Sequence, residues 1–228
     1  MGSYVAGFKR LHVGVFDAEA NKIIKKMIWE DEKGGTVNMN ISGMSPETVD
    51  MWASNKRVWM KKQGTNEVKS DIDLFNIPTD DLNMVLGREK DANGTAWVGD
   101  DTKAPYVAVV GESEAGVSGE PIYCALLKGT FSLDSIEFKT KGEKAEAPEP
   151  TKLHGDWMNR KVDGKSRVYG YHEGSKGAEE FLKKVFVGYT SNEEPSDNED
   201  NQAQDMALSS PKNIEVMPNA KSASVSAE

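Results

Sequence analysis

The chain has 228 residues and a formal net charge of −9. That length allows one domain with a sizeable core, or one domain and a tail. Residues 191–228 hold eight acidic and two basic residues, which leaves 29 acidic and 26 basic residues in residues 1–190. A body so close to neutral argues against a general nucleic-acid binder, because such proteins need a basic surface that displaces counterions from phosphates.

Cys124 is the only cysteine, so the sequence contains no disulfide framework and is compatible with a reducing cytoplasm. No apolar run approaches the roughly 20 residues that span a bilayer. The first ten residues lack the apolar stretch of a signal peptide. We therefore expect no membrane partner.

The first part of the chain predicts strands. Residues 4–16 are typical of an arm that continues into a strand, with Leu11, Val13 and Val15 on one face. A second apolar segment follows at residues 22–29.

Residues 36–42 alternate between apolar and polar side chains, which is the pattern of a strand with one buried face. The face expected to be buried holds Val37, Met39 and Ile41. The opposite face has two amides and a hydroxyl but no charge, from Asn38, Asn40 and Ser42. Most faces of this kind are simply solvated.

The next segment predicts a short helix and then a long hairpin. Ser45 and Pro46 can begin a helix that ends near Asn55, because serine caps free amides and proline suits the first helical position. Residues 57–63 and 67–77 then predict two strands around a turn at residues 64–66. The strands are rich in charge, so at least one face of the hairpin is expected to meet solvent or a partner.

A second short helix is predicted at residues 79–86, with Thr79 as its N-cap and Gly87 just past its end. The most apolar segments of the chain, residues 106–110 and 122–127, follow. They predict the central strands of the fold.

Residues 130–140 again alternate, and the expected buried residues are Phe131, Leu133, Ile136 and Phe138. The pair Asp134 and Ser135 interrupts the alternation and indicates a β-bulge. Residues 142–150 are charged and broken by prolines, which is typical of a solvated connector. Residues 151–158 predict the next strand. Its buried side would be formed by Leu153, Gly155 and Trp157.

The end of the body is expected at residues 168–171, a short strand, and residues 179–187, a last helix or strand. The chain as a whole predicts a mainly β fold: an antiparallel β-sandwich or barrel at residues 1–190, with two or three short flanking helices and a long hairpin. Residues 191–228 predict a flexible acidic tail, because they hold too few apolar residues to offset the entropy of ordering. From Ser210 the tail resembles the first strands of a bacterial Ig-like domain that then stops.

The sequence offers one candidate nucleophile. Ser113 lies in a Gly-x-Ser-x-Ala pattern after an apolar strand, which approaches the nucleophile elbow of serine hydrolases. That elbow needs a helix directly after the serine, and Gly116, Gly119 and Pro121 prevent one. We therefore interpret the segment as a connection between strands and expect no catalytic residue. A serine hydrolase that uses Ser113 is kept as the weakest alternative.

No cofactor or metal site is expected. The histidines His12, His154 and His172 are far apart, and no Cys-x-x-Cys pattern or phosphate-binding loop accompanies them. Exposed tryptophans could form a carbohydrate-binding or host-binding platform on a monomeric module, which is the second alternative. Tryptophans buried in the core or between subunits would supply apolar area, which we favour. The five are Trp29, Trp52, Trp59, Trp97 and Trp157.

Four stretches of sequence carry a specific resemblance. They are GFKRLHVGVF at residues 7–16, WEDEKGGTV at 29–37, ASNKRVWMKKQGTNEVKS at 53–70 and LLKGTFSLDSIEFKTKGEKAEAPEPTKLHGDWMNRK at 126–161. Together they resemble the major tail proteins of long-tailed, non-contractile bacteriophages of Gram-positive hosts, in order over residues 4–190. The resemblance implies a tail-tube β-sandwich that closes into hexameric rings, which stack into a tube.

The resemblance also implies partners and a location. The partners would be other copies of the chain, the tape-measure protein, and the distal tail and terminator proteins. DNA would pass through the tube in transit without specific binding. The protein would be assembled in the host cytoplasm and reside in the virion tail.

Residues for these contacts are assigned as hypotheses. Candidate subunit contacts lie in the arm, the hairpin tip and the charged connector, at Tyr4, Val5, Phe8, Gly64, Thr65, Asn66, Glu143 and Glu146. Candidate lumen-facing residues are Asn38, Asn40 and Ser42. A wall without lysine or arginine would not trap the phosphates of passing DNA.

Overall fold

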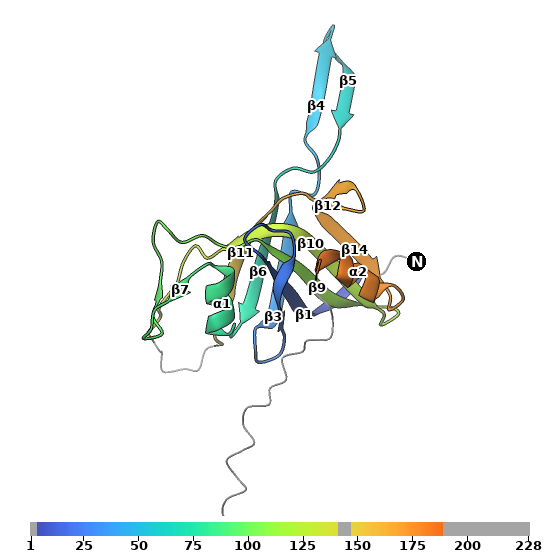
Figure 1. The fold of residues 1–228 in the computed structure, drawn as a ribbon. Helices are drawn as coiled ribbons and strands as arrows, with labels where there is room; N and C mark the ends of the chain where they lie inside the picture. Colours follow the sequence, from blue (N-terminus) through green and yellow to red (C-terminus); the bar gives the residue numbers. More distant parts are fainter. Residues whose placement is uncertain (1–3, 141–146, 189–228) are drawn as a thin grey trace, which may run out of the picture. The chain divides into compact units, whose positions relative to one another are not determined.

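The computed structural model describes residues 4–140 and 147–188. These residues lie in the first of the two units into which the chain divides, Met1–Thr190 and Ser191–Glu228. The expected acidic tail and the Ig-like start at Ser210 fall in the second unit, outside the described residues. The described part of the first unit is mainly antiparallel β structure with two short helices, as the sequence predicts (Figure 1).

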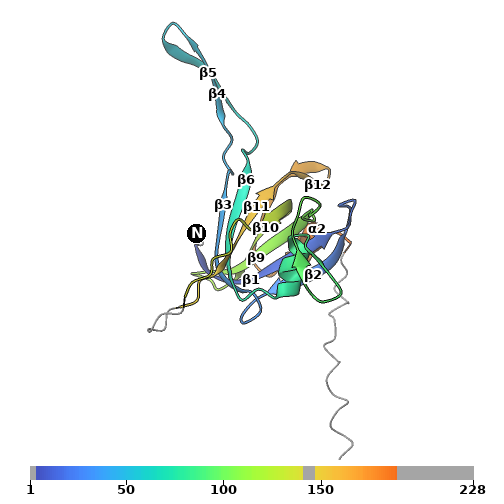
Figure 2. The same cartoon turned by 90° about the vertical axis from the view of Figure 1, so that its left-hand side faces the viewer.

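A single large sheet forms the body of this unit (Figure 2). In the described residues it has eight strands: β1 (Val5–Phe16), β2 (Ile23–Trp29), β3 (Gly35–Ser42), β6 (Val68–Phe75), β9 (Val107–Ala115), β10 (Pro121–Ser132), β11 (Thr151–Trp157) and β14 (Tyr169–Glu173). Their order is β2–β1–β9–β10–β11–β6–β3, and β14 also pairs with β10. The apolar segments at residues 106–110 and 122–127 therefore lie in central strands, as predicted.

The sheet divides along β10. Residues 122–126 pair with β14, whereas residues 129–132 pair with β11. The pairing of β9 with β10 shifts register between Leu126 and Gly129, which indicates a bulge that redirects the strand. The bulge predicted at Asp134 and Ser135 is wrong, because β10 has already ended at Ser132.

The two ends of the sheet approach each other. β3 lies beside β1 where the Thr36 hydroxyl donates a hydrogen bond to the Phe8 carbonyl. The sheet therefore curls toward a barrel, which was one of the two predicted architectures. The larger core cluster includes the fully buried side chains of Leu11, Val13, Trp29, Ile72, Leu74, Leu126 and Leu153.

The last helix, α2 (Ala178–Val185), packs against a second core cluster on the central strands. Val185 and the following Phe186 contribute to that cluster together with β-strand residues Ala108, Val110 and Ala125. The central strands are thus covered by apolar side chains on both faces. This arrangement explains why all six residues at positions 11–16 of β1 are buried.

The first helix, α1 (Thr79–Val85), is confirmed, but the predicted Thr79 N-cap is wrong. Pro78 occupies the cap position, and the structure gives it no side-chain capping bond. Gly87 ends the helix with φ of +66°, and a Cβ added there would lie 2.0 Å from the Lys103 carbonyl oxygen. Glycine is therefore required at that position.

Residues 133–140 do not continue the strand as predicted. Phe131 is buried and Leu133 packs against the core, but Ile136 and Phe138 are 63% and 94% exposed. No ladder partner holds residues 133–140 in a sheet, so the alternation there does not produce a buried face. The next predicted strand is confirmed as β11, with its expected residues buried: Leu153, Gly155 and Trp157.

The helix predicted at residues 45–55 is wrong, because the segment forms β4 (Thr48–Ala53). The remaining described strands form small hairpins: β4 pairs with β5 (Lys56–Lys62), β7 (Glu89–Lys90) with β8 (Ala96–Trp97), and β12 (Arg160–Val162) with β13 (Lys165–Arg167). The β4–β5 hairpin extends away from the body (Figure 1).

Candidate assembly surfaces

The β4–β5 hairpin turns at Ser54 and Asn55, not at residues 64–66 as predicted. Both turn residues have positive φ, 51° and 61°, which is the conformation of a two-residue type I′ hairpin turn. Gly64 and Thr65 therefore lie in the segment that connects β5 to β6, not at the tip of the hairpin. Asn66 closes its base, because its backbone N–H donates to the Gly43 carbonyl oxygen at 3.0 Å.

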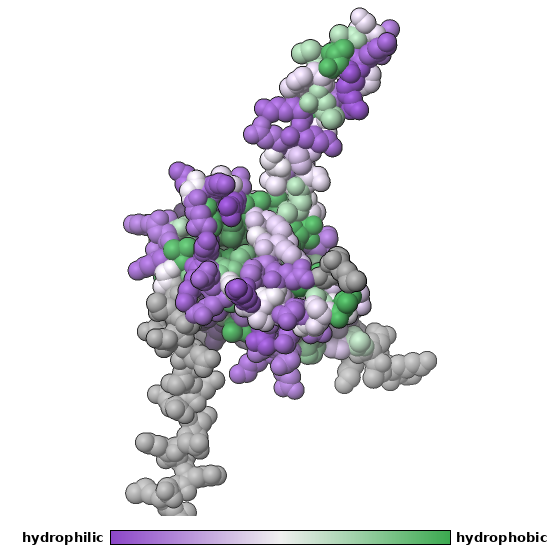
Figure 3. Space-filling model, turned by 90° about the vertical axis from the view of Figure 1, so that its right-hand side faces the viewer, coloured by the Kyte–Doolittle hydropathy of each residue, from purple (hydrophilic) through white to green (hydrophobic). Residues whose placement is uncertain are grey.

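Apolar side chains on the hairpin have no cover within the subunit. Val49, Met51 and Trp59 share one face, since Met51 lies directly opposite Trp59 in the ladder. They are 61%, 59% and 48% exposed, and every other residue of β4 and β5 is exposed as well. Figure 3 shows apolar residues at this projection beyond the body. An isolated two-stranded hairpin is marginally stable in water, so this one is suited to binding a partner.

The hairpin is also basic. Residues 48–62 hold four basic residues and the single acidic residue Asp50. Arg57 forms an ion pair with Asp50 at 3.2 Å. Lys56, Lys61 and Lys62 have no ion pair among the residues that the structure describes. A partner surface with acidic residues would therefore complement it.

The N-terminal arm packs on its own subunit. Tyr4 accepts a hydrogen bond from the Gly116 N–H at 2.9 Å and donates its hydroxyl to the Gly116 carbonyl oxygen at 3.3 Å. Val5 pairs with Ala115 of β9, and Phe8 packs against the larger core cluster. Tyr4 and Val5 remain 64% and 55% exposed, so this end of the arm presents apolar surface.

A groove of about 450 Å³ separates the arm from the edge strand β3. Val5 and Phe8 line one side, Met39 and Ile41 line the other, and Ser113 lies between them. We name this surface the arm groove.

Ser113 has a structural role in the arm groove. It lies within β9, two residues before the strand ends, and its hydroxyl donates to the Gly7 carbonyl oxygen at 2.6 Å. Its Oγ also lies 3.2 Å from the carbonyl oxygen of Ala6. These bonds hold the irregular pairing of β1 with β9 between Ala6 and Arg10. The sharp turn and the helix of a nucleophile elbow do not follow the serine.

The candidate lumen residues Asn38, Asn40 and Ser42 lie on the exposed face of β3. Val37 was predicted to point inward, but it is 55% exposed, because a register shift between Thr36 and Asn38 disturbs the alternation. Met39 and Ile41 pack against the core as predicted.

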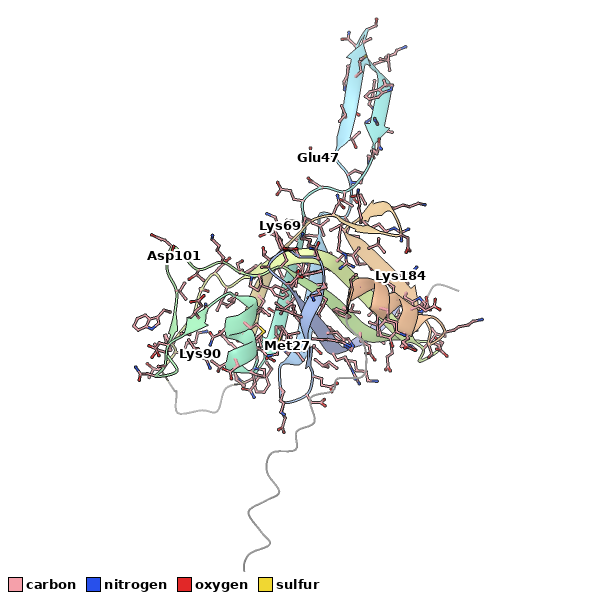
Figure 4. The ribbon with its side chains drawn as sticks, in the orientation of Figure 1. Met27, Glu47, Lys69, Lys90, Asp101 and Lys184 are labelled. Carbon is pink, nitrogen blue, oxygen red and sulfur yellow. The ribbon has the colours of Figure 1, made fainter. Side chains whose placement is uncertain are left out.

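The face with the candidate lumen residues continues across two further strands. Asn38, Asn40 and Ser42 pair with Asp73, Asp71 and Lys69 of β6, which pair in turn with Lys152, His154 and Asp156 of β11. The face is therefore polar throughout, with three aspartates against two lysines. Figure 4 labels Lys69 at the upper end of this face, below the hairpin.

The turn between β7 and β8 is held by the Asp91 carboxylate. One oxygen accepts hydrogen bonds from the backbone N–H groups of Asn93 and Thr95, each at 2.9 Å. The other accepts from the Trp97 indole N–H at 3.0 Å. These hydrogen bonds lower the pKa of Asp91. The bond from Trp97 is the largest cause, and the bonds from the backbone add to it. Trp97 is itself 66% exposed, so the turn presents an indole ring whose polar atom is already bonded.

Glu143 and Glu146 lie outside the described residues. His12 bonds to Glu112, His154 to Asp71, and His172 stacks on Phe181. Of the tryptophans, Trp29 and Trp157 are buried, whereas the exposed ones are Trp52, Trp59 and Trp97.

The described residues contain neither a metal-binding cluster nor a membrane-spanning helix. Within residues 4–140 and 147–188, no group of three histidine, cysteine, aspartate or glutamate side chains could hold a metal ion. No helix in that part of the chain is long and apolar enough to cross a membrane.

The uncovered apolar face of the hairpin favours a protein that contacts other proteins, and the structural role of Ser113 argues against a hydrolase. A comparison with protein families agrees: residues 5–194 match the phage tail tube protein family, and the chain belongs to that family. No curated protein matches the chain. The chain is accordingly a structural component of a virion tail, not an enzyme, and the part of the resemblance that concerns phage tail tube proteins is confirmed. Family membership also implies self-association and contacts with other tail proteins.

Proposed function

We propose that the chain assembles into hexameric rings that stack into the tail tube of a non-contractile, long-tailed phage of a Gram-positive host. The observation that supports self-assembly best is the β4–β5 hairpin, whose apolar face has no partner within its own subunit. DNA passes through the finished tube without being bound. The tape-measure protein occupies the tube first, and the distal tail and terminator proteins contact its two ends.

The hairpin of one subunit contacts a different surface on the next. Such a head-to-tail contact closes into a ring when the rotation per subunit divides a full turn. Full burial of a side chain such as Val49, Met51 or Trp59 contributes on the order of 2 kcal/mol. Three such side chains per contact, repeated around a ring, would favour the assembled state strongly.

Further contacts come from the arm and from strand edges. Val5 and Phe8 border the arm groove, the exposed Tyr4 directly precedes Val5, and the outer edge of β3 is also available for pairing. The connector residues Glu143 and Glu146 are assigned to the same role. In the revised hairpin, residues 64–66 support its base instead of forming its tip.

The lumen is assigned to the polar face that contains Asn38, Asn40 and Ser42. Asp71 and Asp73 extend that face on β6. Carboxylates repel DNA phosphates, and the three aspartates of this face outnumber its two lysines, Lys69 and Lys152. A wall of this composition suits passage better than retention.

Electron microscopy with negative stain tests self-assembly on concentrated wild-type protein and on the variant Met51→Ser/Trp59→Ser. We expect rings or tubes from the wild type and monomers from the variant. Ile24→Ser provides a matched control, because Ile24 is an equally exposed apolar residue on β2, at 63%. A wild-type protein that stays monomeric at millimolar concentration would contradict the proposal.

A further inference from the structure

The loop that contains Trp97 is the strongest candidate for the surface that receives the hairpin. Residues 89–101, which we name the acidic loop, hold four acidic residues and one basic residue. The basic residue, Lys90, is engaged by Asp80. Asp91 is engaged within the loop. In the described part of the chain, the remaining acidic residues Glu89, Asp100 and Asp101 form no ion pair.

The charges of the two elements are complementary. On the hairpin, three lysines form no ion pair with any described residue: Lys56, Lys61 and Lys62. On the acidic loop, the three carboxylates of Glu89, Asp100 and Asp101 also form no ion pair with any described residue. All six residues are exposed. Opposite charges on facing surfaces favour encounter and fix the orientation of two partners.

The acidic loop also presents two exposed apolar side chains, and hydrogen bonds hold the turns on either side of them. Trp97 and the adjacent Val98 are each 66% exposed. The Trp97 indole is held by Asp91, and the next turn is held by bonds between Gly99 and Thr102 at 2.9 and 3.0 Å. An aromatic side chain that is fixed before binding loses little entropy on contact, which is typical of the residues that dominate binding energy at interfaces.

We propose that the acidic loop of one subunit binds the β4–β5 hairpin of a neighbouring copy, with Trp97 and Val98 against the hairpin's apolar side chains and its lysines beside the loop's carboxylates. The inference rests on the proposed self-assembly and names the surface that receives the hairpin. Asp101 on the acidic loop and Glu47 at the hairpin base lie well apart in the same subunit (Figure 4). The contact therefore joins two chains, and because its two surfaces differ it can propagate around a ring.

Charge reversal tests the contact through two variants. The hairpin variant is Lys61→Glu/Lys62→Glu, and the loop variant is Asp100→Lys/Asp101→Lys. Each alone places like charges against each other, so each should need at least a tenfold higher concentration than wild type to assemble. In a one-to-one mixture, opposite charges meet at every contact when the two variants alternate around the ring. A ring of six subunits allows this alternation, because six is an even number. The mixture should therefore assemble like wild type in sedimentation velocity and negative-stain images.

The control variant Lys165→Glu/Lys176→Glu reverses two exposed lysines elsewhere and should assemble normally. Circular dichroism checks that every variant folds. Normal assembly of the loop variant would overturn this inference while leaving self-assembly intact. So would a hairpin variant that fails alone and is not restored in the mixture, since the hairpin would then bind elsewhere, for example in the arm groove. A wild-type chain that never assembles would refute the proposed function as well.

Discussion

Trp157 donates its indole N–H to the Ser70 hydroxyl oxygen at 2.8 Å, and both residues are buried. The bond crosses from β11 to β6, so it ties the branch of the sheet that supports the hairpin to the core. Phe131 meets the Trp157 ring edge to face, with centroids 5.8 Å apart. Gly155 leaves the space that this hydrogen bond occupies, because a Cβ added there would lie 2.6 Å from the Ser70 hydroxyl oxygen.

Ser70→Ala should destabilise the fold by about 1–3 kcal/mol, because it leaves a buried indole N–H without an acceptor. Urea unfolding followed by tryptophan fluorescence measures the change. Ser132→Ala provides the control, since Ser132 is exposed at the end of β10 and should change stability by less than about 0.5 kcal/mol. Equal unfolding midpoints for the two variants would show that the bond contributes nothing.

Gly43 is expected to be essential at the base of the hairpin. Its φ is +75°, and an added Cβ would lie 1.8 Å from the Glu67 carbonyl oxygen. Gly43→Ala should therefore push the segment at residues 66–67 away from residue 43 and break the bond from the Asn66 N–H to the Gly43 carbonyl oxygen. Both thermal stability and assembly should fall. Thermal melting and electron microscopy measure these two effects.

Gly64 provides the matched comparison for Gly43. It also has positive φ, +87°, but an added Cβ there has no atom within 4 Å. Gly64→Ala should cost only about 1–2 kcal/mol of backbone strain and should leave assembly intact. If the two alanine variants behave alike, the close approach at Gly43 has no structural importance.

The hairpin shows where prediction from sequence reached its limit. Val49, Met51 and Trp52 fit one face of a helix as well as they fit a ribbon with apolar residues on both faces. A strand is usually predicted from the alternation that one buried face imposes on its sequence. This hairpin is exposed on both faces, so its sequence carries no such alternation. The Ser54–Asn55 turn was the available signal, because asparagine tolerates positive φ, but Gly64 offered a more conventional turn.

Strands with one buried face were easier to predict. Leu153, Gly155 and Trp157 alternate over the full length of β11, and their pattern is borne out by their burial. Ile136 and Phe138 show the same spacing but are exposed, since alternation says nothing about whether a partner strand is present. The acidic loop was not predicted as a site at all. Its features depend on the fold of the Asp91 turn, which composition does not reveal.

Stability should depend on pH through Glu112. The hydrogen bond from His12, at 3.0 Å, is the largest cause that lowers the pKa of Glu112, and the positive charge of Arg10 lowers it further. A carboxyl group whose pKa is lower in the folded chain adds stability above its unfolded pKa. That stability is lost as the pH falls through the folded pKa.

Glu112→Gln should therefore lower the urea midpoint at pH 7, and the difference from wild type should shrink as the pH is lowered below the usual glutamate range. Unfolding curves between pH 7 and pH 3 measure this trend. Glu114→Gln is the control, because Glu114 is exposed on the same strand and its carboxylate forms no ion pair or hydrogen bond within residues 4–140 and 147–188. A difference that stays constant with pH would show that Glu112 acts only through packing.

The lumen assignment predicts what happens when the polar face becomes basic. Asp71→Lys/Asp73→Lys replaces two carboxylates beside Asn38 and Asn40, and in the proposed tube the change is repeated by every subunit. We expect tubes of this variant to bind DNA at low salt and to release it as salt rises, because counterion release drives such binding. Wild-type tubes should bind little under the same conditions. Glu19→Lys/Glu32→Lys makes an equal charge change at exposed positions in the turns before and after β2, outside strands β3, β6 and β11. If the second variant binds DNA inside the tube and the first does not, the lumen is lined by a different face.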